Sequence, residues 1–497
     1  MNPTLILSII AAYILLLFGI AHLTTRKVDS QSFYNGNRRS PWYIIAFGML
    51  ATSISGITFV SVPGMVMNSG FAYMQMVFGF IFGYIAVAAI LLPLYYKLNL
   101  TTIYTYLKGR FGMQSYKTGA SFFLLSRTLG SALRLFIVAI VLQTAVFDSW
   151  NIPFIATVSI TMLLIFLYTR KGGIKTVIWT DVIQGIVFFG AIVLCLIHIK
   201  NVLDLDFMGM VRTIADSGIA TTCGDKTLST IYVGEAAHPR FFWKQFLAGI
   251  FTVIVMTGLD QDQMQKNLAC RSLKDAQKNM LTYGVMFVPV NLLFLSLGVL
   301  LVVFAQQVGL NPFALSPDEL FPTLATQADP ATGELYLGTF VAILFILGII
   351  AAAYSSADSA VTALTTSFTV DILGVKNDDP KLMKKRTIVH IGVSLVLIFV
   401  IVFFRYLSND SVINAVYAIA GYTYGPLLGL FTFGLFTKYA VKDRYVLIVA
   451  VLSPILSYIL NTYVHNFGFA ILIVNGALCF IGLWLIRDKK TQKLVIS

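Results

Sequence analysis

Long apolar runs recur along nearly the whole chain, and they restrict what it can fold into. A membrane-crossing helix needs about 20 apolar residues. Runs close to or above this length lie at residues 4–24, 41–69, 71–96, 118–147, 153–169, 176–199, 241–262, 281–305, 337–368, 386–404, 411–437, 445–463 and 466–487. Only 11% of the residues are charged, whereas soluble domains carry roughly 25%. We therefore predict an all-α, polytopic membrane bundle with about 13 transmembrane helices.

The basic residues are divided unevenly between the two sides of this predicted bundle. Of the 35 lysines and arginines, 27 lie in one set of alternate loops, which the positive-inside rule places in the cytoplasm. The N-terminus is then outside and the basic tail RDKKTQK inside, in a multi-pass protein of the cell's inner (plasma) membrane. The net charge of +13 is therefore a topology signal and not a nucleic-acid site.

The chain is predicted to be a single membrane domain, 1–497, without a soluble domain. The first apolar run lacks a small-residue cleavage site, so we expect a retained extra span within residues 1–30. Two external loops, 200–240 and 306–336, are long enough to contain short helices or a lid. The four cysteines are scattered and give neither a disulfide framework nor a metal-binding spacing.

A stripe of polar side chains crosses the apolar run 337–368. Within the segment AAAYSSADSAVTALTTS, helical spacing puts five of them on one face: Ser355, Asp358, Ser359, Thr362 and Thr366. An ionisable group inside a bilayer is unfavourable unless it faces protein or water. Hydroxyl and carboxylate oxygens suit a small, partly dehydrated cation such as sodium. The stripe predicts an ion-coupled transporter.

The run 41–69 is unusual because its middle, ATSISGITFVSVPG, mixes small and polar residues. Gly56 and the pair Pro63-Gly64 weaken a helix and free backbone carbonyls. Secondary transporters hold substrates and ions at such broken helices. The alternative is close helix packing through small residues, but the polar stripe in the same chain favours transport.

A third motif, GGIKTVIWTDVIQG at 172–185, puts Asp181 inside a span after a glycine pair that predicts a sharp turn. An intramembrane carboxylate is by default a functional hypothesis. The alternative is an ion pair with Lys175 near the membrane interface.

Together these motifs resemble the sodium/solute symporter family, which includes bacterial proline, sugar and sialic acid carriers. The resemblance covers about residues 30–440 and rests on four segments: GGIKTVIWTDVIQG, AAAYSSADS with its exit TSFTVDIL, YLKGRFG and TGLDQDQMQKNLACRS. It implies a LeuT-like fold of two inverted five-helix repeats, 41–199 and 241–437. The C-terminal spans and tail, 445–497, would follow the second repeat.

The resemblance also implies a main sodium site built from neutral oxygens. Its ligands here would be the carbonyls of Ala51, Ile54 and Ala352 and the side chains of Ser355 and Ser356. Neutral ligands suit reversible binding, because a transported ion must also leave.

Some family members resemble one another in a second sodium site beside the first. The matching positions here are Asp181, Ser355, Asp358 and Ser359. The chain departs from the pattern at Asp358, where a hydroxyl residue is usual, which leaves the number and identity of the ions open.

Candidate substrate residues come from the broken helix and from the span 118–147. The broken helix offers Ser53, Ser55 and Thr58. Arg134 resembles the arginine that binds the carboxylate in sialic acid carriers, since its planar fork forms two parallel bonds to a carboxylate. The alternative is an ion pair between Arg134 and an aspartate inside the bundle. Gln75 lies about two positions from the glutamine that assists in those carriers.

Three tyrosines, Tyr417, Tyr422 and Tyr424, crowd the run 411–437. They either gate the cavity from outside or pack helices together.

The leading hypothesis is a sodium-coupled symporter that imports a small polar solute, a carboxylate such as sialic acid or else a sugar or another neutral solute. An ion channel is the alternative from another class, but the polar groups are spread over dissimilar spans. No HExxH, GxSxG or P-loop pattern suggests an enzyme. The expected partners are Na+, one solute and the lipid bilayer, with no organic cofactor, no other metal and no nucleic acid.

Overall fold

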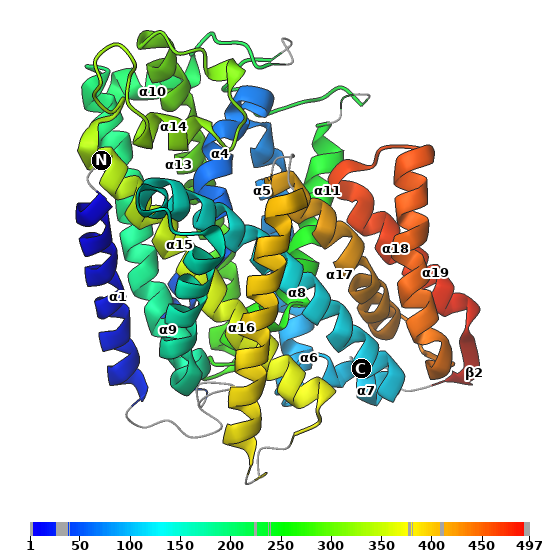
Figure 1. Ribbon diagram of the computed structural model, residues 1–497. Helices are drawn as coiled ribbons and strands as arrows, with labels where there is room; N and C mark the ends of the chain where they lie inside the picture. Colours follow the sequence, from blue (N-terminus) through cyan, green and yellow to red (C-terminus); the bar gives the residue numbers. More distant parts are fainter. Residues whose placement is uncertain are drawn as a thin grey trace.

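The computed structural model describes residues 3–25, 38, 40–222, 226–236, 238, 240–375, 379, 381–407 and 412–491, and the end of the basic tail lies outside them. This part of the chain folds into a helical bundle (Figure 1). Its α-helices are α1 (Pro3–Thr25), α3 (Trp42–Ser53), α4 (Gly56–Ser69), α5 (Tyr73–Ala86), α6 (Leu92–Lys97), α7 (Thr105–Arg110), α8 (Met113–Leu142), α9 (Phe154–Val202), α10 (Phe207–Ala215), α11 (Phe242–Val253), α12 (Gln261–Asn267), α13 (Leu273–Gln307), α14 (Leu320–Thr326), α15 (Gly338–Ser367), α16 (Leu382–Leu407), α17 (Val412–Phe436), α18 (Val446–Tyr463) and α19 (Ile471–Leu485).

Short helical turns of other types connect or extend these helices. The 3-10 turns are η2 (Gly70–Ala72), η5 (Asp148–Trp150), η7 (Pro312–Ala314), η9 (Asp443–Tyr445) and η10 (Gly468–Ala470). The π turns are η3 (Val87–Leu91), η4 (Gln143–Phe147), η6 (Ile254–Gly258) and η8 (Phe368–Ile372).

The bundle also contains one small β-ribbon that an all-α prediction does not include. Strands β1 (Tyr439–Val441) and β2 (Arg487–Thr491) pair antiparallel, with Ala440 opposite Asp488 and Val441 opposite Arg487. The ribbon joins the segment after α17 to the segment after α19 at one end of the bundle (Figure 1).

The described residues contain 10 helices long and apolar enough to cross a membrane, or 11 if one bent pair counts as a span. The predicted count of 13 is not confirmed, because two of the predicted spans contain shorter apolar helices, Trp42–Ser53 and Phe154–Thr169. The multi-pass, helical character of the chain follows from the long apolar helices.

A glycine produces the sharp turn predicted before Asp181. Gly173 has φ 52° and ψ −140° inside α9, a conformation that residues with a Cβ rarely adopt. The segment 154–202 is therefore two helices that meet at this kink, and the second one carries Asp181.

Two further interruptions shape the interior. Helices α3 and α4 are separated at Ile54 and Ser55, which both have extended backbone conformations. Helix α11, continued by η6, bends by 70° into α12. Asp260 caps α12, because its side chain accepts bonds from the backbone N–H of Asp262 (2.9 Å) and of Gln263 (3.3 Å).

Helix α15 is the buried centre of the arrangement, and it packs on α8, α9 and α3. The two long loops contain α10, η7 and α14, as the sequence predicts. In Figure 1, α10 and α14 lie at the same end of the bundle as the start of α1, while α7 and β2 lie at the opposite end.

Candidate functional site

The break between α3 and α4 faces the polar stripe of α15. The last carbonyls of a helix have no partner within that helix. At the end of α3, the Ser356 hydroxyl donates to the Thr52 carbonyl (3.1 Å). The Thr52 and Ser355 hydroxyl oxygens lie 3.2 Å apart. Helix α15 therefore contacts the open end of α3 through two consecutive serines.

The five residues of the expected main sodium site belong to these same two segments. Ala51 lies in the last turn of α3 and Ile54 directly after it. Ala352 lies one turn before Ser356 on α15, and all of these residues are buried. The structure thus brings the end of α3 and two hydroxyls of α15 to one place.

The side chains of the four residues of the expected second ion site have different hydrogen-bond partners. The Ser355 hydroxyl donates to the Asp181 carboxylate (2.5 Å). Ser359, one turn later, instead donates to the carboxylate of Asp262 on α12. Within this set, the side-chain hydrogen bond that the structure shows is the one between Ser355 and Asp181.

The Asp358 carboxylate accepts hydrogen bonds from two side chains of α9. They are the hydroxyls of Tyr168 (3.0 Å) and Thr180 (3.2 Å), which both reach Oδ2. Its other oxygen, Oδ1, is buried and has no hydrogen-bond partner among the described residues. Asp358 thus joins α15 to both halves of α9 on either side of the kink.

Lys266 is the partner of Asp181, and the sequence analysis missed it. Its ammonium nitrogen lies 2.7 Å from Asp181 Oδ2 and 2.5 Å from Thr52 Oγ1. The side chains of Lys266 and Asp181 are 1% and 0% exposed. Lys266 is one of the 27 basic residues that the sequence places in cytoplasmic loops, and the alternative partner Lys175 is not the one observed. The bend before α12 turns Lys266 inward.

A second buried charge network surrounds the start of α12. The Arg127 guanidinium, from α8, donates to the carboxylate of Asp262 and lies 3.8 Å from that of Asp260. The Tyr424 hydroxyl, from α17, donates to Asp260 (2.5 Å). These contacts join α8, α12 and α17, and through Ser359 they reach α15.

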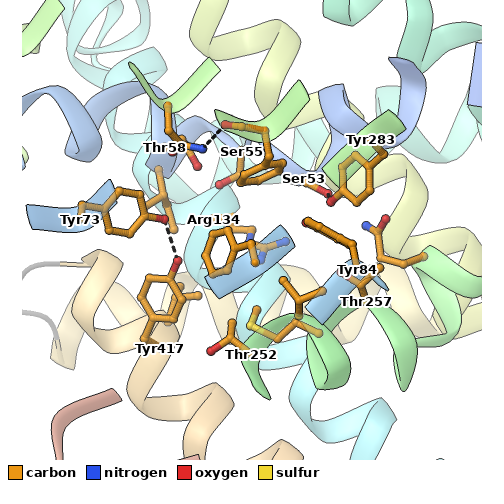
Figure 2. A pocket seen from close by; sticks show the side chains of 18 of the residues that line it. Ser53, Ser55, Thr58, Tyr73, Tyr84, Arg134, Thr252, Thr257, Tyr283 and Tyr417 are labelled. Carbon is orange, nitrogen blue, oxygen red and sulfur yellow. Dashed lines mark hydrogen bonds between the residues drawn. The ribbon is translucent and has the colours of Figure 1, made fainter. Parts of the chain in front are cut away.

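A cavity of about 810 Å³, including the part open to solvent, lies beside the α3–α4 break (Figure 2). Its walls combine hydroxyls, aromatic rings, two arginines and two amides. The lining residues used below are Ser53, Ser55, Thr58, Tyr73, Phe80, Tyr84, Arg127, Arg134, Gln263, Tyr283, Phe287, Asn291 and Tyr417.

Arg134 lies among these side chains (Figure 2) and differs from Arg127, which also lines the cavity. Arg127 is neutralised by Asp260 and Asp262. In the described part of the chain no carboxylate pairs with Arg134, so the alternative of an internal ion pair applies to Arg127 instead.

The predicted substrate residues of the broken helix also line the cavity, whereas Gln75 does not. The Gln75 amide donates to the carbonyls of Ala72 and Arg240 (both 3.1 Å) and accepts from the Val233 N–H (3.1 Å). Gln75 therefore fastens the loop 200–240 to α5. The glutamine that lines the cavity is Gln263, whose buried Oε1 has no hydrogen-bond partner among the described residues.

The three tyrosines of α17 separate in the structure. Tyr417 lines the cavity, with its hydroxyl oxygen 3.0 Å from that of Tyr73. Tyr424 belongs to the α12 network. The Tyr422 ring contacts Tyr458 of α18. Among the three, only Tyr417 is placed to act as a gate of the cavity.

Known transporters share this fold. The structure aligns with that of a Na+-coupled sialic acid symporter in a substrate-bound, outward-open state, with a TM-score of 0.79, 22% identity and coverage of 98% of this chain and 99% of that one. It also aligns with a nucleobase-cation-symport-1 family transporter bound to bromovinylhydantoin, with a TM-score of 0.54, 14% identity and coverage of 91% and 94%. Both comparisons support the LeuT-like fold.

Sequence relatives cover most of the chain as well. The sodium/sialic acid symporter of Proteus mirabilis is 26% identical over 483 residues, which are 93% of this chain and 90% of that protein. The sodium/sialic acid symporter of Aliivibrio fischeri is 27% identical, covering 88% and 83%. The human sodium/iodide cotransporter is 24% identical, covering 82% and 61%.

The profile of the sodium:solute symporter family matches residues 33–443. Because this match spans well over half of the sequence, the chain belongs to the sodium:solute symporter family and is a sodium-coupled symporter, not an enzyme.

Proposed function

We propose that the chain imports a small organic carboxylate with sodium by alternating access, and that sialic acid is the first candidate solute. The observation that carries this proposal is the Arg134 guanidinium, which lines the cavity and pairs with no carboxylate in the described part of the chain. A guanidinium fork matches a carboxylate with two parallel hydrogen bonds. The relatives from Proteus mirabilis and Aliivibrio fischeri are named for sialic acid, which carries both a carboxylate and several hydroxyls.

Hydroxyls and an amide near Arg134 would bind the rest of the solute. Ser53, Ser55 and Thr58 line the cavity on the side of the broken helix. The free Gln263 Oε1 would accept a bond from a solute hydroxyl. Gln75 is left out of this proposed site, because its amide is bonded to backbone groups.

We propose the main sodium site at the carbonyls of Ala51, Ile54 and Ala352 and the hydroxyls of Ser355 and Ser356. The contact between Ser356 and the end of α3 supports this site. The five oxygens are neutral, which suits an ion that must be released inside the cell. The membrane potential drives it inward with roughly 2.3 kcal/mol per charge per 100 mV.

The proposal for the second set, Asp181, Ser355, Asp358 and Ser359, is conditional. Lys266 already contacts Asp181, and Ser359 is bonded to Asp262. A second cation would bind at Asp181 only in a conformation in which Lys266 has moved away.

We also propose that two inverted repeats, 41–199 and 241–437, form the transport core of a single domain in the inner (plasma) membrane. The first helix of each proposed repeat is interrupted, at Ile54 in one and before α12 in the other. Interruptions at corresponding positions of two halves are typical of the site of a secondary transporter. The N-terminus outside and the C-terminus in the cytoplasm agree with the opposite ends at which α1 begins and β2 lies (Figure 1).

A neutral sugar is the second candidate solute. Tyr84 and Phe287 line the cavity with Phe80, and aromatic rings of this kind pack against the apolar faces of a sugar ring. In this case Arg134 would bind a hydroxyl instead of a carboxylate.

Thermal unfolding of the purified protein distinguishes the two candidates, because a ligand that binds the folded state raises Tm. Sialic acid, its neutral methyl ester and a neutral sugar are each added with and without sodium to the wild type and to Arg134→Lys. We expect a sodium-dependent rise in Tm with sialic acid only, absent in Arg134→Lys. Equal shifts with the acid and its ester would favour the neutral solute. A shift that does not depend on sodium, with uptake equal in sodium and potassium, would contradict coupling.

A further inference from the structure

The Lys266 ammonium lies in the region where a second cation is expected. It contacts one oxygen of Asp181 and the hydroxyl of Thr52. The other Asp181 oxygen accepts from Ser355. Asp181 Oδ2 and Thr52 Oγ1 could each ligate a sodium ion, but in this structure both already bind the Lys266 ammonium.

This ammonium is also connected to the proposed main sodium site. Thr52 is its second partner, and the same residue meets Ser356 through its carbonyl and Ser355 through its hydroxyl. A buried ammonium has three N–H donors, and Thr52 Oγ1 accepts from one of them. Lys266 is thus linked through one residue, Thr52, to both hydroxyls that we propose as sodium ligands.

Charge argues against a second sodium beside Lys266. Asp181 is fully buried, and the single positive charge of Lys266 neutralises it. A sodium ion placed next to the same carboxylate would be repelled by the ammonium, and this repulsion is strong where water is excluded. Of the other members of the expected second set, the Ser359 side chain bonds to Asp262 and that of Asp358 to Tyr168 and Thr180, and neither is hydrogen-bonded to Asp181 in the described part of the chain.

We infer that Lys266 is a tethered cation that takes the place of a second sodium ion at Asp181, so that one sodium ion is transported per solute. This inference rests on the proposed main sodium site. Lys266 then belongs to the ion-binding site, because its fixed positive charge neutralises Asp181 in place of a second sodium ion.

The sodium-to-solute ratio, measured from reversal potentials in proteoliposomes, tests the inference. We expect a ratio of 1 in the wild type. Lys266→Ala removes the ammonium and leaves room for an ion beside an unpaired Asp181, so we expect an additional sodium-binding event. It would appear as a sodium-induced rise in Tm steeper than in the wild type, and as a ratio close to 2 if the variant transports. Lys244→Met, which removes a lysine outside this cluster, is the matched control and should keep the wild-type values.

A double variant keeps the test decisive if Lys266→Ala does not fold. Asp181→Asn with Lys266→Met replaces the ion pair by neutral side chains of similar size, and we expect its ratio to stay at 1. A wild-type ratio of 2 that falls to 1 in the double variant would overturn the inference, since Asp181 would then bind a transported ion. A folded Lys266→Ala without additional sodium binding would also overturn it.

The proposed main site has its own test, so the two failures can be told apart. If Ser356→Ala leaves sodium activation unchanged, the main site is wrong whatever the ratio is. If Ser356→Ala weakens sodium activation while the ratio is 2, only the assignment of Lys266 fails.

Discussion

The hydroxyl oxygens of Tyr73 and Tyr417 lie 3.0 Å apart, and this contact joins the start of α5 to α17 beside the solute cavity. Both side chains line the cavity (Figure 2). Tyr417→Phe removes the hydrogen bond and keeps the ring, which changes stability by about 1 kcal/mol. If the pair helps to close the cavity, the solute escapes more readily and KM for uptake rises about fivefold. Tyr422→Phe, outside the cavity, is the control, and an unchanged KM in Tyr417→Phe would make the pair a packing contact.

Removing either hydroxyl from the proposed main sodium site is expected to weaken sodium activation. Ser355→Ala and Ser356→Ala each delete one oxygen while the backbone carbonyls remain. A loss of about 1.4 kcal/mol corresponds to a tenfold higher half-saturation for sodium, measured as uptake against sodium concentration. Ser457→Ala is a matched control, because the hydroxyl of this buried serine of α18 donates to the Ser453 carbonyl of its own helix. Unchanged sodium activation in both site variants would remove this site from the proposal.

The two cavity arginines are expected to differ in their effect on stability. Arg127→Gln leaves Asp260 and Asp262 without their shared cation, and breaking a buried pair typically destabilises a protein by about 3–5 kcal/mol. Arg134→Gln breaks no ion pair, so its Tm should stay near that of the wild type while solute binding is lost. Thermal unfolding in detergent gives both values. Equal loss of Tm in the two variants would mean that Arg134 also has a structural partner.

Asp358→Ser places a hydroxyl at the position where the family pattern has one. We expect transport to continue, with a half-saturation for sodium raised about two- to fivefold. The reason is that a carboxylate one turn from Ser355 attracts cations through the low-dielectric interior. Asp358→Asn, similar in size and uncharged, should give the same change. If both variants keep the wild-type sodium affinity and pH profile, Asp358 instead holds α15 to α9 through Tyr168 and Thr180.

Much of the fold could be predicted from the sequence, because apolar length and helix-breaking residues are local signals. The interruption of the run 41–69 is an example. The structure breaks it at Ile54 and Ser55 and continues α4 through Pro63, although the sequence suggested Pro63 equally well. The backbone at Pro63 packs so closely against Gly298 of α13 that a Cβ on this glycine would lie 2.0 Å from the Pro63 carbonyl oxygen. Such a tertiary contact leaves no trace in the local pattern.

The candidate site was predicted less completely, because long-range pairing of charges is not visible in a single span. The stripe on α15 and Asp181 were identified from their unusual polarity. The sequence places Lys266 in a cytoplasmic loop, since it follows the apolar run 241–262, and no local pattern indicates the 70° bend that turns it inward. A polar segment, QDQMQKN, directly after the capping residue Asp260 was the available signal. Gln75 shows the converse. It lies near the expected position in the sequence, but in the structure it does not line the cavity, because its amide bonds to backbone groups.

The shortness of α12 has a consequence for how this chain tolerates change. Its seven residues, with the capping Asp260, carry side chains that contact at least five other helices. The contacts are Asp260 to Tyr424 of α17, Asp262 to Arg127 of α8 and Ser359 of α15, and Lys266 to Thr52 of α3 and Asp181 of α9. One inserted or deleted residue would rotate everything after it by about 100° around the helix axis, so that several of these buried charges would lose their partners together. The length of this segment is therefore fixed more strictly than the identity of most residues that line the cavity.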